Sequence, residues 1–254
     1  MTKIFVAGAT GYIGANVVKS ALEQNFEVVA ASRKESTDFD PKDQNLTVIK
    51  ITENDDSWLA KLQDIDVVIS CLASRSGEPK DAHKVDFKLN KLILEKAKAI
   101  DCSQFILLSA ICVQKPKLAF QFEKLAFEEI LINSGLNFSI IRPTAYFKSL
   151  SGQIENIKKG KPYVYFGDGK LTQCNPISEK DLSLFILSCI RDRNKWKKIL
   201  PIGGPNQSLT PKNVGEMLFK IFEVTPKYRS FPTKILDVIG LFFLIGSPFS
   251  NWAK

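Results

Sequence analysis

Short apolar runs alternate with stretches of helical periodicity over the first 145 residues. After the first run, apolar residues recur at Val17, Val18, Ala21 and Leu22, the three- and four-residue spacing of one helix face. The run at 66–70 is almost continuously apolar, which is typical of a central strand covered on both sides. Alternating strands and helices predict an α/β fold with a doubly wound parallel sheet. The expected strands are 3–7, 27–31, 46–51, 66–70, 104–108 and 137–141.

The alternation of strands and helices loosens after residue 145. We therefore divide the chain into a larger first region, residues 1–145, and a smaller mixed α/β region, residues 146–254. The smaller region is expected to pack beside the sheet and to bind the substrate. Its expected elements are a short strand within 161–170, helices at 179–190 and 211–222, and a strand at 199–204.

A glycine-rich turn joins the first strand to the first helix. Gly8, Gly11 and Gly14 form the pattern GxxGxxG, which permits a tight turn and a close approach of the backbone to a pyrophosphate. A glycine turn can be purely structural, but the strand before it and the helix after it favour an NAD(P)-binding Rossmann region over residues 1–145. The spacing is typical of extended and atypical short-chain dehydrogenases/reductases. We expect pyrophosphate contacts from Gly8, Thr10, Gly11, Tyr12, Ile13 and Gly14.

The end of the second strand carries Ser32, Arg33 and Lys34. Enzymes that prefer NAD have an Asp or Glu here, which binds the ribose 2′-hydroxyl. A hydroxyl and two cations instead suit a 2′-phosphate, so the sequence favours NADPH. The alternative is a basic turn on the surface.

Other cofactor contacts are expected where later strands end, because ligands bind at the carboxyl edge of open α/β sheets. Residues 66–70, 104–108 and 137–141 each lead into a loop at this edge. The expected contacts in or near these loops are Cys71, Leu72, Ala73, Ser109, Ala110, Pro143, Thr144 and Phe147.

Phe120 and Lys124 lie one helical turn apart and share a helix face. Most short-chain reductases have a tyrosine four residues before this lysine, and that tyrosine protonates the substrate. A phenyl ring has no proton to give, so the enzyme need not reduce a carbonyl by the usual tyrosine route. Lys124 is the expected catalytic residue, which would hold the nicotinamide ribose; the alternative is a surface lysine on an amphipathic helix.

The composition limits the possible partners and cofactors. The net charge of +8, from 35 basic and 27 acidic side chains, favours anionic partners such as nucleotide phosphates, acidic substrates or anionic lipids. The basic residues are scattered, which argues against nucleic acid. Five cysteines without a CxxC pair and a single histidine predict no disulfide framework and no metal site. The compartment is expected to be reducing.

Two terminal features bear on location. The first strand begins at residue 3, so we expect no signal or transit peptide in this sequence. The apolar run at 233–246 is too short to cross a bilayer, which requires ~20 residues. It fits either a buried helix or a helix that lies on a membrane surface, which would make a peripheral membrane contact.

Several segments outside the glycine turn resemble one family. They are LASRSG (72–77), LLSAICVQKP (107–116), RPTAYFKSL (142–150), KPYVYFGDGKL (161–171), PISEKDL (176–182), LPIGGP (200–205), LTP (209–211) and GEMLFK (215–220). Through them, and through the Phe120 and Lys124 pair, the chain resembles the NADPH-dependent 3,8-divinyl (proto)chlorophyllide 8-vinyl reductases, which are atypical short-chain reductases. The likeness runs from the first strand to about Gly240. The family usually continues past the equivalent of Phe249, and its loop corresponding to residues 32–46 is longer.

The resemblance implies reduction of the C8 vinyl group of a magnesium tetrapyrrole, divinyl chlorophyllide or protochlorophyllide, to ethyl by NADPH. It implies a place in the cytoplasm of a photosynthetic bacterium, or in a plastid, in the stroma or at the thylakoid. Residues expected to face the substrate are Arg75, Cys112, Gln114 and Phe147.

Two other functions remain open from the sequence. One is a non-catalytic protein that binds NADP and pigment, as an assembly factor or a redox sensor. The other is an isoflavone-reductase-like enzyme for phenolic substrates, which shares Lys124 but lacks the LASRSG and PISEKDL segments.

Overall fold

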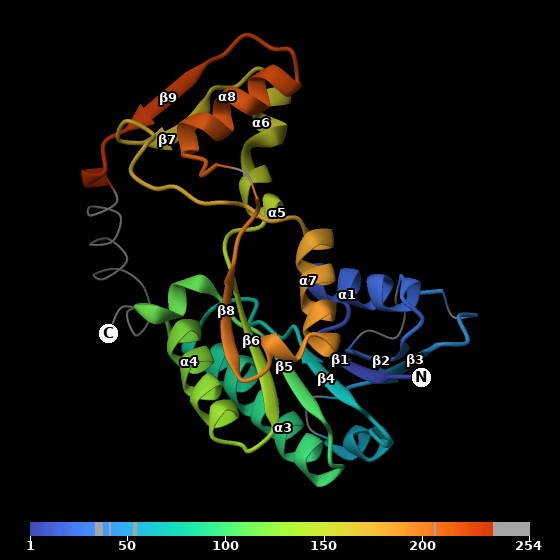
Figure 1. Ribbon diagram of the computed structural model, residues 1–254. Coiled ribbons are helices and arrows are strands. Elements are labelled where there is room, and N and C mark those ends of the chain that lie inside the picture. The colour runs from blue at the N-terminus through green and yellow to red at the C-terminus, as the bar shows by residue number, and fades with distance from the viewer. Residues whose placement is uncertain (34–37, 41, 53–54, 206, 236–254) are drawn as a thin grey trace. The chain divides into compact units, whose positions relative to one another are not determined.

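The computed structural model describes residues 1–33, 38–40, 42–52, 55–205 and 207–235. Within these ranges, seven parallel strands form one sheet in the order β3-β2-β1-β4-β5-β6-β8 (Figure 1). Each expected strand of the first region is present, and the doubly wound α/β fold is confirmed. The strand order reverses between β1 and β4, and ligands bind at such a switch point, at the carboxyl edge. The strands are β1 (Lys3–Ala7), β2 (Glu27–Ser32), β3 (Leu46–Lys50), β4 (Val67–Ser70), β5 (Gln104–Leu108), β6 (Asn137–Pro143) and β8 (Lys198–Ile202).

Helices cover both faces of this sheet. Figure 1 shows α1 (Tyr12–Glu23) and α7 (Glu179–Arg191) on one face, and α3 (Asn90–Ala99) and α4 (Ala119–Ile132) on the other. The core between the sheet and α3 and α4 contains the fully buried rings of Phe5, Phe105 and Phe127. Two-sided burial explains why the central strands are continuously apolar. Short 3-10 turns complete this unit: η1 (Ser57–Lys61), η3 (Ile111–Gln114) and η5 (Arg193–Lys195).

The helix that follows β4 is not uniform. It opens as α2 (Pro79–Ala82), continues as a π-helical segment, η2 (His83–Leu89), and ends as α3. Pro79 stands at the first helical position, where its missing N–H costs nothing. A π-helical segment has i→i+5 in place of i→i+4 hydrogen bonds and often marks a functional site.

The chain forms two compact units that are interleaved in sequence. The first comprises residues 1–143 and 179–202, and the second comprises 144–178 and 203–254. The expected division after residue 145 lies beside the first crossing at Pro143. However, α7 and β8, which we expected in the smaller region, belong to the first unit. β8 pairs in parallel with β6, and α7, whose Leu182, Ile186 and Leu187 are buried, packs on α1.

The second unit has its own small core. β7 (Tyr163–Phe166) and β9 (Tyr228–Phe231) pair in parallel, and α8 (Pro211–Ile221) contacts β7. Ile157, Tyr163, Val214 and Phe219 form the buried cluster. A Cβ on Gly215 would lie 2.7 Å from the Tyr163 ring, so glycine permits the helix to lie close to the strand. The remaining elements are α5 (Phe147–Leu150), η4 (Ser151–Gln153) and α6 (Ile154–Lys158).

No helix in the described part of the chain is both long enough and apolar enough to cross a membrane. The apolar run expected at 233–246 lies outside the described residues from residue 236 onward.

Candidate functional site

The glycine turn after β1 has no room for side chains. Gly8 has a φ of +75°, and a Cβ there would lie 2.7 Å from the carbonyl oxygen of Cys71. A Cβ on Gly14 would lie 2.1 Å from the carbonyl oxygen of Gly8, an impossible approach. Gly11 N–H donates to Gly8 O at 2.9 Å, which closes the turn. Backbone packing among β1, β4 and α1 therefore requires glycine at positions 8 and 14.

The amino end of α1 presents backbone N–H groups. Gly11 is the N-cap residue, without a capping side chain, and the first intrahelical bond runs from Ala15 N–H to Gly11 O at 2.9 Å. The N–H groups of Tyr12, Ile13 and Gly14 precede that bond and point out of the helix end. With the helix dipole they form a site for an anion such as a pyrophosphate.

The side chain of Tyr12 joins α1 to α7. Its hydroxyl donates to Glu179 Oε2 at 2.5 Å. Burial, and then the carboxylate of Glu179, raise the pKa of Tyr12 to about 12. The hydrogen bond from Tyr12 lowers the pKa of Glu179. Tyr12 therefore offers its backbone, rather than its hydroxyl, to the glycine turn.

A pocket of about 700 Å³ lies near the end of β2. Trp58 and Leu92 supply apolar walls, and Arg33 and Lys80 supply positive charge. Asp81 also lines it, and backbone N–H bonds from Ser76, with a smaller effect of Arg33, lower the pKa of Asp81. Ser32 is buried at the end of β2, whereas Lys34 lies outside the described residues. The pocket is lined by Arg33, Ile51, Thr52, Asp56, Trp58, Lys80, Asp81, His83, Lys84, Val85, Lys88, Leu89 and Leu92.

Lys124 is buried beneath the loop that follows β4. Its Nζ lies 3.0 Å from Asp86 Oδ1 and donates to Leu72 O at 3.1 Å. Only 7% of the lysine side chain is exposed, so the alternative of a surface lysine is wrong. Phe120, one turn earlier on α4, is half-buried. Burial raises the pKa of the neighbouring Cys71 thiol to about 12, with a smaller opposing effect of Lys124.

The loop after β4 is fixed by two carboxylates of the following helix. Asp86 Oδ2 accepts the N–H of Ser74 at 3.2 Å. Asp81 Oδ2 accepts the N–H groups of Arg75 and Ser76 at 2.9 and 3.0 Å. The side chain of Arg75 is exposed. The loop thus has a defined backbone, and Arg75 projects from it into solvent.

The hydroxyl of Ser109, at the end of β5, donates to Glu128 Oε1. Both carboxylate oxygens of Glu128 accept from Arg142, on β6. Ser109 and Glu128 are 4% and 1% exposed. The hydroxyl of Ser109 is therefore directed into a buried network, and the backbone of Ser109 and Ala110 remains at the carboxyl edge.

The other expected residues fall in both units. Within the first, Cys112 and Gln114 are exposed on η3, and Pro143 ends β6. Within the second, the hydroxyl of Thr144 donates to Asn175 O, and Phe147 begins α5 with 45% of its surface exposed. In the described residues, no group of three or more His, Cys, Asp or Glu side chains could hold a metal ion.

The sequence analysis missed Asp86, Asn90 and Glu128. Asp86 and Asn90 lie four residues apart, on the same helix face as the buried Ile93 and Ala97. Polar residues at core-facing positions need partners, and that signal could have identified Asp86 and Asn90. The π-helical segment that contains Asp86 cannot be recognised from a pattern in the sequence.

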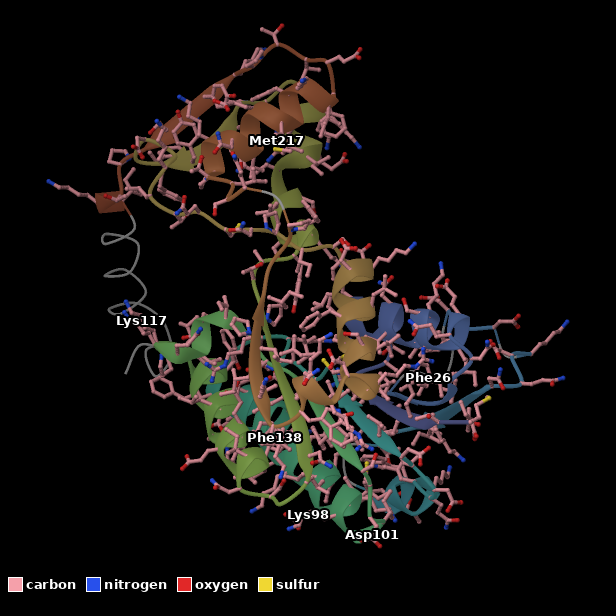
Figure 2. The ribbon with its side chains drawn as sticks, in the orientation of Figure 1. Phe26, Lys98, Asp101, Lys117, Phe138 and Met217 are labelled. Atoms are coloured by element: carbon pink, nitrogen blue, oxygen red, sulfur yellow. The ribbon has the colours of Figure 1, made fainter. Side chains whose placement is uncertain are left out.

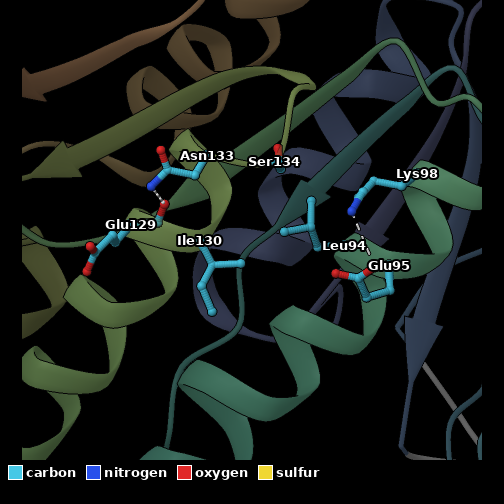
Figure 3. Close-up of a pocket in the computed structure, with 7 residues that line it drawn as sticks. All are labelled: Leu94, Glu95, Lys98, Glu129, Ile130, Asn133 and Ser134. Carbon is cyan, nitrogen blue, oxygen red and sulfur yellow. Dashed lines mark hydrogen bonds and ion pairs between the residues drawn. The ribbon is translucent and has the colours of Figure 1, made fainter.

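A second pocket, of about 350 Å³, lies between the carboxyl ends of α3 and α4 (Figure 3). Its polar groups pair within their own helices: Lys98 with Glu95 at 3.5 Å, and Asn133 with the carbonyl of Glu129 at 2.9 Å. Figure 2 shows Lys98 and Asp101 at the end of the sheet where the strands begin. This pocket therefore lies opposite the edge that carries the glycine turn.

Residues 8–193, which include the glycine turn and Lys124, match the model of the NAD(P)H-binding protein family. The chain belongs to the NAD(P)H-binding family. A nicotinamide dinucleotide is therefore the class of cofactor of this chain. Membership of this family agrees with the parallel sheet, the glycine turn and the exposed helix N–H groups.

Curated relatives include two chloroplastic divinyl chlorophyllide a 8-vinyl-reductases. The protein from Arabidopsis thaliana is 46% identical over 98% of this chain and 64% of its own length. The protein from Cucumis sativus is 46% identical over 93% of this chain and 61% of its own length. The chain thus spans less than two thirds of these relatives. Photosystem II assembly factor Ycf39 of Cyanophora paradoxa is 32% identical over 59% of this chain and 47% of its own length.

Solved structures confirm the fold. UDP-glucuronic acid 4-epimerase from Bacillus cereus, in complex with NAD, superimposes with a TM-score of 0.77 over 91% of this chain and 87% of its own. The two sequences are 20% identical, so the likeness concerns architecture alone.

Proposed function

We propose that this chain reduces the C8 vinyl group of divinyl chlorophyllide or protochlorophyllide to ethyl, with NADPH as the hydride donor. The observation that carries this proposal is the pair on α4: a buried, ion-paired Lys124 with Phe120 in place of the tyrosine acid. The 46% identity to the Arabidopsis vinyl reductase supports it.

NADPH would be held along the carboxyl edge by residues of this chain. The glycine turn and the N–H groups of α1 suit the pyrophosphate. Arg33, beside the pocket that Trp58 lines, suits the adenosine end with its 2′-phosphate, because a guanidinium binds phosphate well. Lys124 would bind the nicotinamide ribose, and Pro143 and Thr144 would line the nicotinamide pocket. The cofactor supplies a hydride from C4 of its nicotinamide.

The chemistry of a vinyl group fits the residues at this edge. A vinyl conjugated to a macrocycle accepts hydride at its terminal carbon, and the negative charge spreads over the ring. No alkoxide forms, so no acid is needed beside a carbonyl oxygen. Phe120 has no proton to donate, and the hydroxyl of Ser109 is directed to Glu128. The one proton that completes the ethyl group would come from water or from a side chain.

Candidate substrate contacts occur in each unit taken by itself. Arg75 projects from the loop after β4 and would pair with a propionate of the pigment. Cys112 and Gln114 on η3, and Phe147 on α5, are exposed and would contact the macrocycle. The second unit is therefore proposed as the substrate-binding part.

We further propose a plastid location with a peripheral membrane contact. The two vinyl reductases named above are chloroplastic. The second unit has eleven lysines and arginines against five acidic residues, a net charge of +6 within the chain's +8. Such a concentration of positive charge favours anionic lipid headgroups. Sedimentation with anionic vesicles, but not with neutral ones, would support this contact; equal recovery with both would contradict it.

The direct test of the reaction is anaerobic incubation of the purified chain with NADPH and divinyl chlorophyllide. We expect a blue shift of the Soret band and conversion of the divinyl peak on chromatography. Unchanged pigment with NADPH bound would overturn the reductase. It would favour a non-catalytic protein that binds NADPH and pigment. The likeness to an assembly factor supports this alternative.

A further inference from the structure

Lys124 and Asp86 form a buried ion pair. Their side chains are 7% and 0% exposed, and Nζ lies 3.0 Å from Oδ1. The same Nζ donates to Leu72 O at 3.1 Å. An ammonium group has three protons; one goes to Leu72 O, whereas the buried Asp86 Oδ1 is ion-paired with Nζ without a hydrogen bond, so Nζ keeps protons for a ligand.

The backbone around Asp86 is held by a side-chain relay. Asp86 lies in the π-helical segment η2, and Asn90 Nδ2 donates to the carbonyls of Asp86 and Val85 at 2.9 and 3.4 Å. Asn90 Oδ1 accepts the hydroxyl of Ser70 at 2.5 Å. Asn90 therefore ties the π-helical segment to the last residue of β4.

The carboxylate of Asp86 also contacts the loop after β4. Its Oδ2 accepts the N–H of Ser74 at 3.2 Å, while its Oδ1 faces Lys124. One side chain thus connects the loop, the π-helical segment and α4. An ammonium at this depth would be strongly disfavoured without a counter-charge.

We propose that Asp86 is the positioning residue of the cofactor site, holding the charged Nζ of Lys124 beside the Leu72 backbone so that it meets the nicotinamide ribose without rearrangement. This inference rests on the cofactor part of the proposed function and is independent of the pigment. A lysine fixed in advance loses less side-chain entropy on binding.

The other titratable groups near Lys124 do not serve as its counter-charge. Burial raises the pKa of the Cys71 thiol to about 12, so this thiol is neutral at ordinary pH. Glu128, one turn further along α4, pairs with Arg142. Glu123, the residue before Lys124 in the chain, pairs with His83 at 3.0 Å. In the part of the chain that the structure describes, Asp86 is the carboxylate paired with Lys124.

The test is NADPH binding by the full chain, followed by fluorescence. Asp86→Asn keeps the shape and the acceptor for Ser74 but removes the charge. We expect it to raise the Kd for NADPH about tenfold. An unchanged Kd would overturn the proposal.

Two further variants separate positioning from general stability. Glu123→Gln removes a carboxylate that joins the same two helices without touching Lys124, and its Kd for NADPH should stay within about twofold. On a Lys124→Gln background, Asp86→Asn should add no further loss of affinity, because Asp86 acts through the lysine. Additive losses in this cycle would show a merely structural role. All these readouts hold whether or not the protein reduces a pigment.

Discussion

The hydroxyl of Ser109 donates a hydrogen bond to the buried carboxylate of Glu128. This contact directs a serine at the end of β5 into the protein, under the carboxyl edge. Phe120, on α4, has no hydroxyl group. Neither of these two side chains therefore offers a hydroxyl to a ligand at this edge, which agrees with the proposed reduction of a conjugated vinyl group.

Removal of Glu128 should destabilise the fold strongly. Glu128→Ala would leave Arg142 and Ser109 buried without their partner, and breaking a buried pair in this way costs about 3–5 kcal/mol. Urea unfolding measures the free energy directly. The neighbouring Glu129 is exposed, so Glu129→Ala should stay within about 0.5 kcal/mol of the parent. Equal effects of the two substitutions would show that the buried network contributes nothing.

Phe120→Tyr should introduce a hydroxyl group that the reaction does not need as an acid. Because the proposed reaction forms no alkoxide, we expect vinyl reduction to continue at a rate within about threefold of the parent, under 1 kcal/mol of barrier. Initial rates with divinyl chlorophyllide test this. A rise of a hundredfold or more would mean that the reaction lacks an acid which the tyrosine supplies.

Arg33→Ala should weaken binding of NADPH and leave binding of NADH nearly unchanged. The loss of one charge-assisted contact worth about 1.5–3 kcal/mol raises the KM for NADPH roughly tenfold or more. Steady-state kinetics with both cofactors measure the ratio. If the preference for NADPH over NADH stayed the same, Arg33 would not be the residue that reads the 2′-phosphate.

The contact between Tyr12 and Glu179 should make stability depend on pH at both extremes. The pKa of Tyr12 is raised from 10.0 to about 12, so its contribution is complete below pH 10 and disappears toward pH 12. The pKa of Glu179 is lowered from 4.5, so its contribution is complete above pH 4.5 and is lost in acid. Tyr12→Phe should flatten both limbs of the unfolding free energy against pH. Identical profiles for the two proteins would contradict this linkage.

Much of the fold could be predicted from the sequence, because burial on both sides of a parallel sheet forces continuous apolar strands. The glycine turn could also be predicted, because Gly8 and Gly14 stand where no Cβ fits. The course of the chain after residue 145 was less predictable. The sequence of an apolar strand such as β8 does not indicate which sheet the strand joins. In the structure, β8 pairs with β6 of the main sheet.

The sequence predicted the glycine turn and Lys124, but it did not predict the side chains that contact Lys124. Lys124 was expected from its spacing to Phe120, whereas its partner Asp86 depends on a π-helical segment and on a contact between helices far apart in sequence. Sequence spacing fixes neighbours along one helix. It does not fix which side chains of two packed helices meet.

Transfer of a label tests the central claim most directly. The full chain is incubated anaerobically with divinyl chlorophyllide and NADPH carrying deuterium at the transferred C4 position, and the pigment is analysed by mass spectrometry. We expect the new C8 ethyl group to contain one deuterium, and Lys124→Ala to give far less product while remaining folded. Ethyl pigment without deuterium, or unchanged pigment beside bound NADPH, would contradict hydride transfer to the vinyl group by this protein.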